Sequence, residues 1–525
     1  MPETADSVPT VASGVGPTGA AAEVLELGRS VRLKLGATLV ALVGSFLASV
    51  ILSRALGRED YGLLVLVYSV AGLALVLSDF GAKSTLIRYL PARRPDAESS
   101  GSAAELAASA LLIQLAGAAL CALVILGTAN LLADRFFRVP ALSWPLAIGA
   151  LYFVGIALRD FVAQLYQSLQ DWKREALVGV VFTGSQLLVL GLWVTFADLT
   201  VTAALIITGG CAFGSAVLGL GLVRHWTWRR AGALLRVRTV SEHAALVWRF
   251  GLPLKAVALS FYALSWADKL MLGWWRQPGE VATYYLAGLF IGAMMTVVNV
   301  LTLVLTPYVS KISTMDQDYI RVRFQVLFRW FLHGATLLAV TVFFLVEPFV
   351  GLAFGPDYAD AVPLFRMLLP VFVLRAGWVA YGIFAMNAYN LVKESVALSS
   401  LLGCAVLIFD LALIPSFGAP GAIAATFLAY GLTRVITLVT VAHMRRIVPM
   451  PSIARALGAA VLVVGSAHML RPAGTPAALA CGVAAPAVYC LALALLSELT
   501  RRDWEVVKMV ATAAWQPLAM AGHRS

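Results

Sequence analysis

Apolar residues run through this chain in long blocks that short polar loops separate. A helix of about 20 apolar residues is long enough to cross the hydrocarbon core of a bilayer. The pattern therefore predicts an all-α polytopic membrane protein with about 14 transmembrane helices. We expect these helices at 33–53, 60–83, 104–132, 141–165, 175–197, 201–223, 250–274, 281–309, 326–354, 362–388, 394–415, 418–442, 452–470 and 476–497.

Composition supports this prediction. The chain has 525 residues, of which 60% are hydrophobic and 13% are charged, and its mean hydropathy is +0.86. A soluble domain carries roughly a quarter of charged residues. The composition therefore excludes a soluble enzyme of this length.

Positive charge is concentrated in alternate loops. Short loops rich in Lys and Arg stay in the cytoplasm, so the loop charges predict that both termini are cytoplasmic. This bias accounts for most of the net charge of +11, and we expect no nucleic-acid partner. The basic loops hold Arg88, Arg93 and Arg94; Lys173 and Arg174; Arg224, Arg229, Arg230, Arg236 and Arg238; Lys311, Arg321 and Arg323; Lys393; and Arg445 and Arg446.

The chain ends are expected to form cytoplasmic tails, and the cysteines predict no disulfide or metal framework. Residues 1–28 are rich in small and polar residues and lack the apolar core of a cleavable signal, so we expect a disordered cytoplasmic tail. Residues 499–525 form the second predicted tail. The cysteines lie in apolar helices without paired spacing, which indicates neither disulfides nor a metal site; they are Cys121, Cys211, Cys404, Cys481 and Cys490.

An internal repeat organises the predicted helices. Leu56-Gly57, between the first two helices, corresponds to Leu272-Gly273 between the seventh and eighth. Tyr61 corresponds to Tyr284 or Tyr285. Because six helices separate the copies, the repeat has parallel topology. We therefore expect two pseudo-symmetric six-helix bundles around a central cavity, at 29–224 and 250–446, joined by a basic cytoplasmic linker at 225–249 and followed by two extra transmembrane helices at 447–498.

Four short segments carry a family resemblance. They cover the chain from about 30 to 445 in a fixed order, and they are Arg54-x-Leu56-Gly57-x-x-x-Tyr61-Gly62 with Asp79-Phe80-Gly81, Ser265 to Tyr285, Phe354 to Ala359, and Gly418 to Thr426. In this combination the chain resembles the polysaccharide biosynthesis flippases of the multidrug, oligosaccharidyl-lipid and polysaccharide exporter superfamily.

The resemblance implies a transporter rather than an enzyme. Members of this flippase family move a polyprenyl-diphosphate oligosaccharide from the cytoplasmic to the outer leaflet of a bacterial inner membrane by alternating access. The implied partners are this lipid-linked substrate, membrane lipid, and polysaccharide polymerase or other assembly proteins. A charged diphosphate and a polar glycan then need a hydrated, cation-bearing path.

Arg375, in the middle of the tenth predicted helix, is the first candidate for that path. An ionisable side chain at the centre of a membrane helix costs about 2.5 to 3.5 kcal/mol on insertion scales, so it is a functional candidate by default. We expect Arg375 to contact the diphosphate or the glycan. An ion pair between Arg375 and Asp410 of the eleventh helix is an equally weighted structural alternative.

The seventh predicted helix supplies a second candidate set. At 100° per residue, one stripe about 40° wide holds two cations with two aromatic residues between them. Aromatic faces stack on sugars, and lysines attract phosphate, whereas lysines near helix ends also extend to the membrane interface. The stripe holds Lys255, Tyr262, Trp266 and Lys269. Asp268 points away from it.

Ion coupling needs a carboxylate in the membrane, and Asp268 and Asp410 are the deep candidates. Arg434 of the twelfth helix is a weaker candidate for gating. Membrane potential alone favours outward movement of an anion by about 2.3 kcal/mol per charge per 100 mV. The coupling ion is therefore left open.

Asp79 has a simpler expected role. It directly precedes Phe80-Gly81 at the end of the second predicted helix. An aspartate at a helix break bonds nearby backbone N–H groups. We expect Asp79 to cap the break.

Other functions compete with the flippase. The lipid II flippases carry a cation in their first helix, but this chain has none between Lys34 and Arg54, which favours capsule, exopolysaccharide or O-antigen units. A multidrug antiporter shares the superfamily. A membrane glycosyltransferase or polymerase would need catalytic carboxylates on an outer loop, and the outer loops hold no pair beyond Asp357 and Asp360. A non-transporting assembly scaffold would bind a partner enzyme or anionic lipid through the basic linker. No Walker A sequence occurs, so ATP hydrolysis is not intrinsic.

Overall fold

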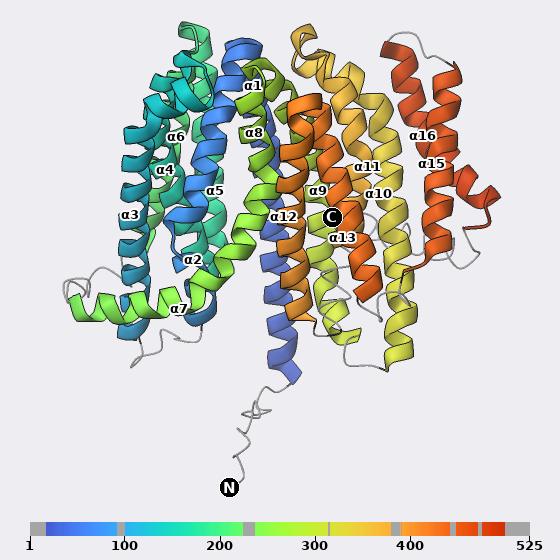
Figure 1. The fold of residues 1–525 in the computed structure, drawn as a ribbon. Helices are drawn as coiled ribbons and strands as arrows, with labels where there is room; N and C mark the ends of the chain where they lie inside the picture. The colour runs from blue at the N-terminus through green and yellow to red at the C-terminus, as the bar shows by residue number, and fades with distance from the viewer. Residues whose placement is uncertain are drawn as a thin grey trace, which may run out of the picture.

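The chain folds into helices throughout the part that the computed structural model describes. That part comprises residues 17–91, 100–223, 237–312, 316–379, 389, 391–440, 448–470 and 475–498. No strand occurs in these ranges. The predicted all-α fold is confirmed, and within the described ranges each predicted span contains helical structure (Figure 1).

The first half of the molecule holds the first six predicted spans. Its helices are α1 (Pro17–Ser78), α2 (Ala82–Tyr89), α3 (Ser100–Leu131), α4 (Ser143–Ser168), α5 (Trp172–Phe196) and α6 (Val201–Leu222), with short η1 (Leu132–Phe136) and η2 (Pro140–Leu142) between α3 and α4.

The second half holds the next six predicted spans, and two helices follow it. Its elements are α7 (Val237–Tyr262), η4 (Ala263–Ala267), α8 (Asp268–Trp275), α9 (Pro278–Ile312), α10 (Gln317–Ala353), η5 (Pro356–Tyr358), α11 (Ala361–Val379), α12 (Val392–Phe417) and α13 (Ala419–Thr440). The last two helices, α15 (Met450–Leu470) and α16 (Thr475–Leu495), pack on α10 at the edge of the molecule (Figure 1).

Helix α1 contains two predicted spans because its backbone breaks at Gly57. The φ of Gly57 is 76° and its ψ is 175°, a conformation that is essentially restricted to glycine. The chain therefore rises through the first segment of α1 and returns through its second segment, residues 58–78. We call the end of the molecule that carries this turn the Gly57 end. Helix α1 begins at Pro17, so helical structure extends into the predicted tail, and residues 1–16 lie outside the described ranges.

The second segment of α1 ends in a capped break. Phe80 has a φ of 44° and Gly81 a φ of 93°. The backbone N–H of Gly81 donates a hydrogen bond of 3.1 Å to Oδ1 of Asp79. The predicted capping role of Asp79 is confirmed, and we call this end of the molecule the Asp79 end.

The seventh predicted span is not one straight helix. Helix α7 runs across the Asp79 end in contact with α2 and α3 before the chain rises into α8 (Figure 1). Its first turns fall in the predicted linker 225–249, of which residues 225–236 lie outside the described ranges. Stacking of Trp248 on Phe80, with ring centroids 6.0 Å apart, holds α7 in place. The π-helix η4 then joins α7 to α8, and such wide turns re-aim a helix.

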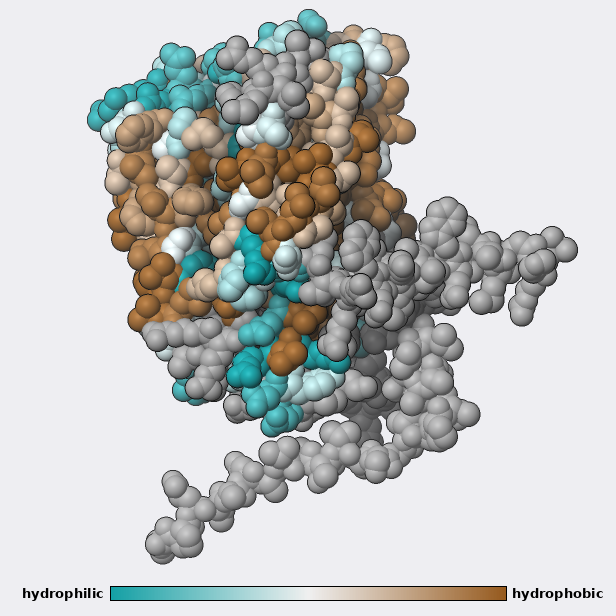
Figure 2. Space-filling model, turned by 90° about the vertical axis from the view of Figure 1, so that its right-hand side faces the viewer, coloured by the Kyte–Doolittle hydropathy of each residue, from teal (hydrophilic) through white to brown (hydrophobic). Residues whose placement is uncertain are grey.

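The surface is that of a membrane protein. Ten helices in the described ranges are long and apolar enough to cross a bilayer, and one of them, Gly36–Ser78, holds two predicted spans. Figure 2 shows a band of hydrophobic residues between hydrophilic ends on the side that carries α15 and α16. The chain is therefore a multi-pass membrane protein.

The two halves contact each other chiefly through α1, α7, α8 and α9. The largest cluster of buried apolar residues includes Leu64 and Leu66 of α1 together with Leu286 and Ala287 of α9. Most residues of functional interest lie along this line of contact.

Candidate functional site

At the Gly57 end, polar bonds join the two halves. Nη1 of Arg58 donates a hydrogen bond of 2.8 Å to Oδ2 of Asp360, and Nε of Arg58 donates one of 3.2 Å to the carbonyl oxygen of Gly279. The backbone N–H of Gly279 donates to Oε2 of Glu59 at 3.0 Å. The turn after Gly57 is thus bonded both to the start of α9 and to the turn before α11.

Two further bonds lie at the same end of the molecule, and both join residues of the second half. Nη2 of Arg276 donates to the carbonyl oxygen of Pro415 at 3.1 Å, and Oε1 of Glu280 accepts from the N–H of Ala419 at 2.7 Å. Arg276, Glu280 and Ala419, together with Arg58, Glu59 and Asp360, line a cavity of about 590 Å³. We call this set of contacts the Gly57 seam.

Two tyrosines lie directly beneath the Gly57 seam. Tyr61 and Tyr358 are each 1% exposed, and their ring centroids are 6.3 Å apart in an edge-to-face arrangement. The hydroxyl of Tyr358 donates to the carbonyl oxygen of Ser53 at 3.0 Å. At Gly62, an added Cβ would lie 1.9 Å from the carbonyl oxygen of Pro278. The backbones of the two halves therefore meet here without intervening side chains.

At the Asp79 end, Lys255 of α7 reaches across to the first half. Its Nζ forms an ion pair with Asp79 and donates a hydrogen bond of 2.9 Å to the carbonyl oxygen of Val76. Gly81 and Gly251 lie so close that a Cβ on Gly251 would come within 2.5 Å of the Cα of Gly81. The residues that cap the end of α1 therefore also hold α7 against the first half. We call this group of contacts the Asp79 seam.

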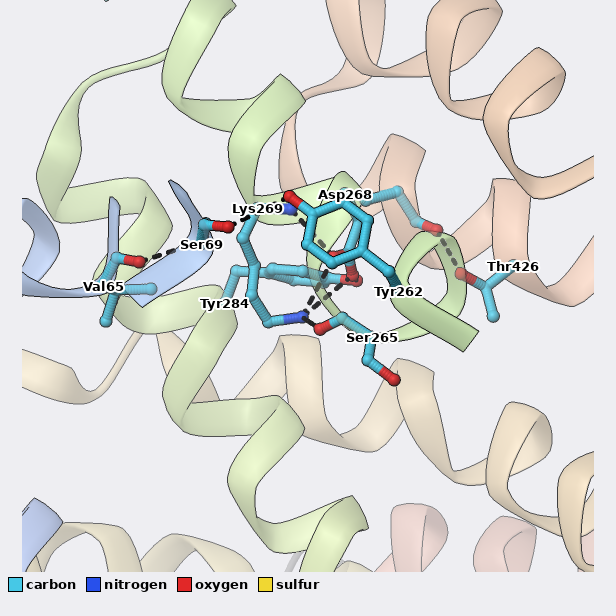
Figure 3. A network of polar contacts seen from close by, with 9 residues as sticks. Val65, Ser69, Tyr262, Ser265, Asp268, Lys269, Tyr284 and Thr426 are labelled. Atoms are coloured by element: carbon cyan, nitrogen blue, oxygen red, sulfur yellow. Dashed lines mark hydrogen bonds and ion pairs between the residues drawn. The ribbon is translucent and has the colours of Figure 1, made fainter. Parts of the chain in front are cut away.

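Between the two seams lies a buried ionic network (Figure 3). Nζ of Lys269 is 3.0 Å from Oδ1 of Asp268 and donates to the carbonyl oxygen of Ser265 at 2.8 Å. The hydroxyl of Tyr284 donates to Oδ2 of Asp268 at 2.6 Å. Asp268 is 5% exposed and Lys269 is 8% exposed. The charge of each residue is neutralised inside the protein.

The predicted stripe of helix seven therefore faces protein groups rather than one open surface. Lys255 and Tyr262 both bond to the second segment of α1, the latter through a hydrogen bond of 3.0 Å from its hydroxyl to the carbonyl oxygen of Ser69. The ring of Trp266 lies against Gly72 and is partly exposed. Nζ of Lys269 lies over the rings of both Trp266 and, on α9, Tyr284, and η4 interrupts the 100° spacing on which the stripe depends.

Asp410 of α12 is fully buried, and neither carboxylate oxygen has a hydrogen-bond partner among the described residues. The ion pair between Asp410 and Arg375 that competed with a functional role of Arg375 is not formed in the described part of the chain. Arg375 lies half-buried on α11. Arg434 of α13 donates a hydrogen bond of 2.7 Å from Nη2 to the carbonyl oxygen of Leu374. Both arginines lie close to Tyr430 of α13.

Sequence reasoning missed the partners at both seams. The pairing of Arg58 with Asp360 and of Asp79 with Lys255 joins residues that lie far apart in the chain. Their charges were visible in the sequence. Their distances depend on how the halves pack.

Sequence comparison identifies a related family. A sequence model described as polysaccharide biosynthesis protein matches residues 28–313. No curated protein matches the chain in sequence.

Solved structures share the fold. The lipid II flippase MurJ, in an inward closed conformation, has a TM-score of 0.70 and 12% identity, over 90% of this chain and 99% of that chain. The MATE multidrug transporter DinF-BH has a TM-score of 0.53 and 17% identity, over 79% of this chain and 96% of that chain. The MATE transporter VcmN of Vibrio cholerae has a TM-score of 0.52 and 14% identity, over 82% and 98%. These proteins have the same helical architecture as this chain.

Proposed function

The chain belongs to the polysaccharide biosynthesis protein family, and we propose that it moves a polyprenyl-diphosphate-linked oligosaccharide across a bacterial inner membrane for polysaccharide export. The observation that carries the proposal is the group of bonds that Arg58 and Glu59 form in the Gly57 seam, because these bonds join opposite halves at one end of a membrane protein. Several of these groups are exposed to solvent, and each exposed ion pair contributes little free energy. The seam can therefore open and close.

We place the Gly57 end on the outer side of the membrane. The loops of the Asp79 end carry most of the Lys and Arg residues, and such loops stay cytoplasmic. In this orientation the structure is closed toward the outside, and both termini are cytoplasmic. Membrane lipid surrounds the apolar band, and a polysaccharide polymerase would receive the product at the outer leaflet.

For the substrate contacts, the geometry favours Arg375 and Trp266 over the remaining members of the predicted set. Lys255, Tyr262 and Lys269 already bond to protein groups. Arg375 is half-buried in the second half and has no carboxylate partner among the described residues. A guanidinium in that setting suits a diphosphate, which it can bind through two parallel hydrogen bonds.

The test is transport by the purified protein in liposomes. We expect a fluorescent polyprenyl-diphosphate sugar to appear in the outer leaflet, and Arg375→Ala to slow this by at least tenfold. Arg366→Ala is the matched control, because Arg366 lies on the same helix and pairs at 2.9 Å with the exposed carboxylate of Glu347. An unchanged rate in Arg375→Ala would remove Arg375 from the substrate path, and transport of organic cations instead of the lipid would favour an antiporter.

We propose Asp410 as the coupling residue, with Asp268 beside it. Burial of a charged carboxylate without a partner costs free energy, and binding of a proton or metal cation at Asp410 would relieve that cost. We expect Asp410→Asn to retain the fold and to abolish stimulation of transport by a proton or sodium gradient. Undiminished stimulation in this variant would exclude the role. The hydrogen bond from Arg434 to α11 favours a gating role for Arg434 between α11 and α13.

A further inference from the structure

Four aromatic rings from four different elements form two stacked pairs near Tyr61, one pair in each half of the molecule. Tyr68 of α1 stacks on Tyr152 of α4, with ring centroids 5.0 Å apart and an interplanar angle of 27°. Trp266 of η4 stacks on Tyr285 of α9 at 6.0 Å and 28°. Tyr285 also contacts Tyr61, at 6.1 Å. Both stacked pairs thus lie on the Asp79 side of the Gly57 seam.

These rings differ from the tyrosines above them in exposure. Tyr61 is almost completely buried, whereas Tyr68, Tyr152, Trp266 and Tyr285 are all partly exposed. None of the four contributes to the polar bonds of either seam. Part of their surface therefore stays accessible in the middle of the molecule.

The hydroxyls of Tyr152 and Tyr285 are also available. Neither has a hydrogen-bond partner among the described residues, and neither is a fully buried polar atom. Buried tyrosine hydroxyls normally find a partner, and in this protein Tyr166, Tyr262 and Tyr284 do so. Tyr152 and Tyr285 therefore each present a partly exposed hydroxyl beside a stacked ring pair.

We propose that Tyr68, Tyr152, Trp266 and Tyr285 form a binding site for a pyranose sugar of the transported lipid. The C–H face of such a ring packs on aromatic faces, and its hydroxyls exchange hydrogen bonds with Tyr152 and Tyr285. Binding sites of this kind combine an apolar lining with a few placed polar groups. The inference rests on the proposed function and adds the part of the substrate that is recognised here.

The position suits a substrate that enters from the Asp79 end. The sugar would lie against the inner side of the closed Gly57 seam, in contact with both halves at once. Tyr68 and Tyr152 belong to the first half, and Trp266 and Tyr285 to the second. A ligand that bridges the stacked pairs is therefore sensitive to movement of one half against the other.

Equilibrium binding to the purified protein in detergent tests this site apart from transport. The probes are a polyprenyl diphosphate that carries one N-acetylhexosamine and the same lipid without a sugar. We expect the wild type to bind the glycosylated lipid more tightly. The double variant Tyr152→Phe/Tyr285→Phe should lose about fivefold in affinity for each hydroxyl with the glycosylated lipid, and nothing with the bare lipid.

Tyr166→Phe is the matched control. It removes a hydroxyl from the same helix α4, one that donates to the carbonyl oxygen of Gly219 at 2.7 Å away from the site. We expect it to leave the preference for the glycosylated lipid unchanged, even where it lowers stability. Equal binding of the two lipids by the wild type would overturn the site, as would an equal loss for both in the double variant. Sugar-dependent binding without transport would support the proposed sugar site and refute the proposed flippase function.

Discussion

Nη1 of Arg58 and Oδ2 of Asp360 lie 2.8 Å apart and join the turn after Gly57 to the turn before α11. The side chain of Asp360 is 69% exposed, so the pair is solvated. Solvated ion pairs contribute about 0.2–1 kcal/mol. The pair therefore biases closure of the Gly57 seam without locking it.

Charge reversal at this pair should open the seam. We expect Arg58→Asp to raise the open fraction by up to about fivefold, the equivalent of about 1 kcal/mol, and Arg58→Asp/Asp360→Arg to restore it. The measurement is the labelling rate of Thr283→Cys by a thiol reagent in a background without the five native cysteines, because Thr283 lines the cavity and is 1% exposed. Equal labelling in the single and double variants would show that the pair does not control the seam.

The buried pair of Asp268 and Lys269 should behave differently. Removal of one partner leaves an uncompensated buried charge, at a cost of about 3–5 kcal/mol. We expect Asp268→Asn or Lys269→Met to lower the unfolding temperature in detergent strongly. The double variant should lose less than the sum of the two, and strictly additive losses would argue against direct coupling.

The sequence predicted the helices well and the helix-seven stripe poorly, for different physical reasons. Apolar length is a local property, so each span could be located from its own residues. The π-helix at Ala263–Ala267 is not visible in that pattern, and it breaks the regular helical spacing between Lys255 and Lys269. The choice between an ion pair and a free guanidinium at Arg375 depended on the distance between two helices, which no local pattern encodes.

Glu498 should make stability dependent on pH. Burial alone would raise its pKa, but hydrogen bonds from Ser452, Arg455 and His333 outweigh burial and hold the pKa below the ordinary value of 4.5. A lowered pKa means that the ionised group stabilises the folded state above about pH 4.5, and that this contribution is lost as the pH falls through the folded-state pKa. The bonds join α10 and α15 to Glu498, three residues beyond the end of α16.

We therefore expect Glu498→Gln to lower stability by about 1–3 kcal/mol at pH 7. The difference from the wild type should shrink as the pH falls below about 4.5. Unfolding temperatures of both proteins between pH 7 and pH 3.5 measure this. Glu347→Gln is the control, because its exposed pair with Arg366 contributes at most about 1 kcal/mol. A difference that grows on acidification would refute the assignment.

The approach of Gly251 to Gly81 gives a steric test of the Asp79 seam. A methyl group at position 251 would lie 2.5 Å from the Cα of Gly81 and 2.7 Å from its carbonyl oxygen. Backbone atoms cannot yield as a side chain does, so α7 must move away from the end of α1. Overpacking of this kind costs about 1–3 kcal/mol, and we expect Gly251→Ala to weaken the ion pair of Lys255 with Asp79.

The matched control is Gly288→Ala on α9, where an added Cβ meets no atom within 4 Å. Alanine in a helix is favoured over glycine by about 0.4–1 kcal/mol, so this variant should be slightly more stable than the wild type. Unfolding temperature reports both effects, and the transport assay shows whether α7 must stay attached for the cycle to run. If Gly251→Ala were as stable as Gly288→Ala, the two backbones would not be in contact in the folded protein, and the Asp79 seam would have to rest on the ion pair alone.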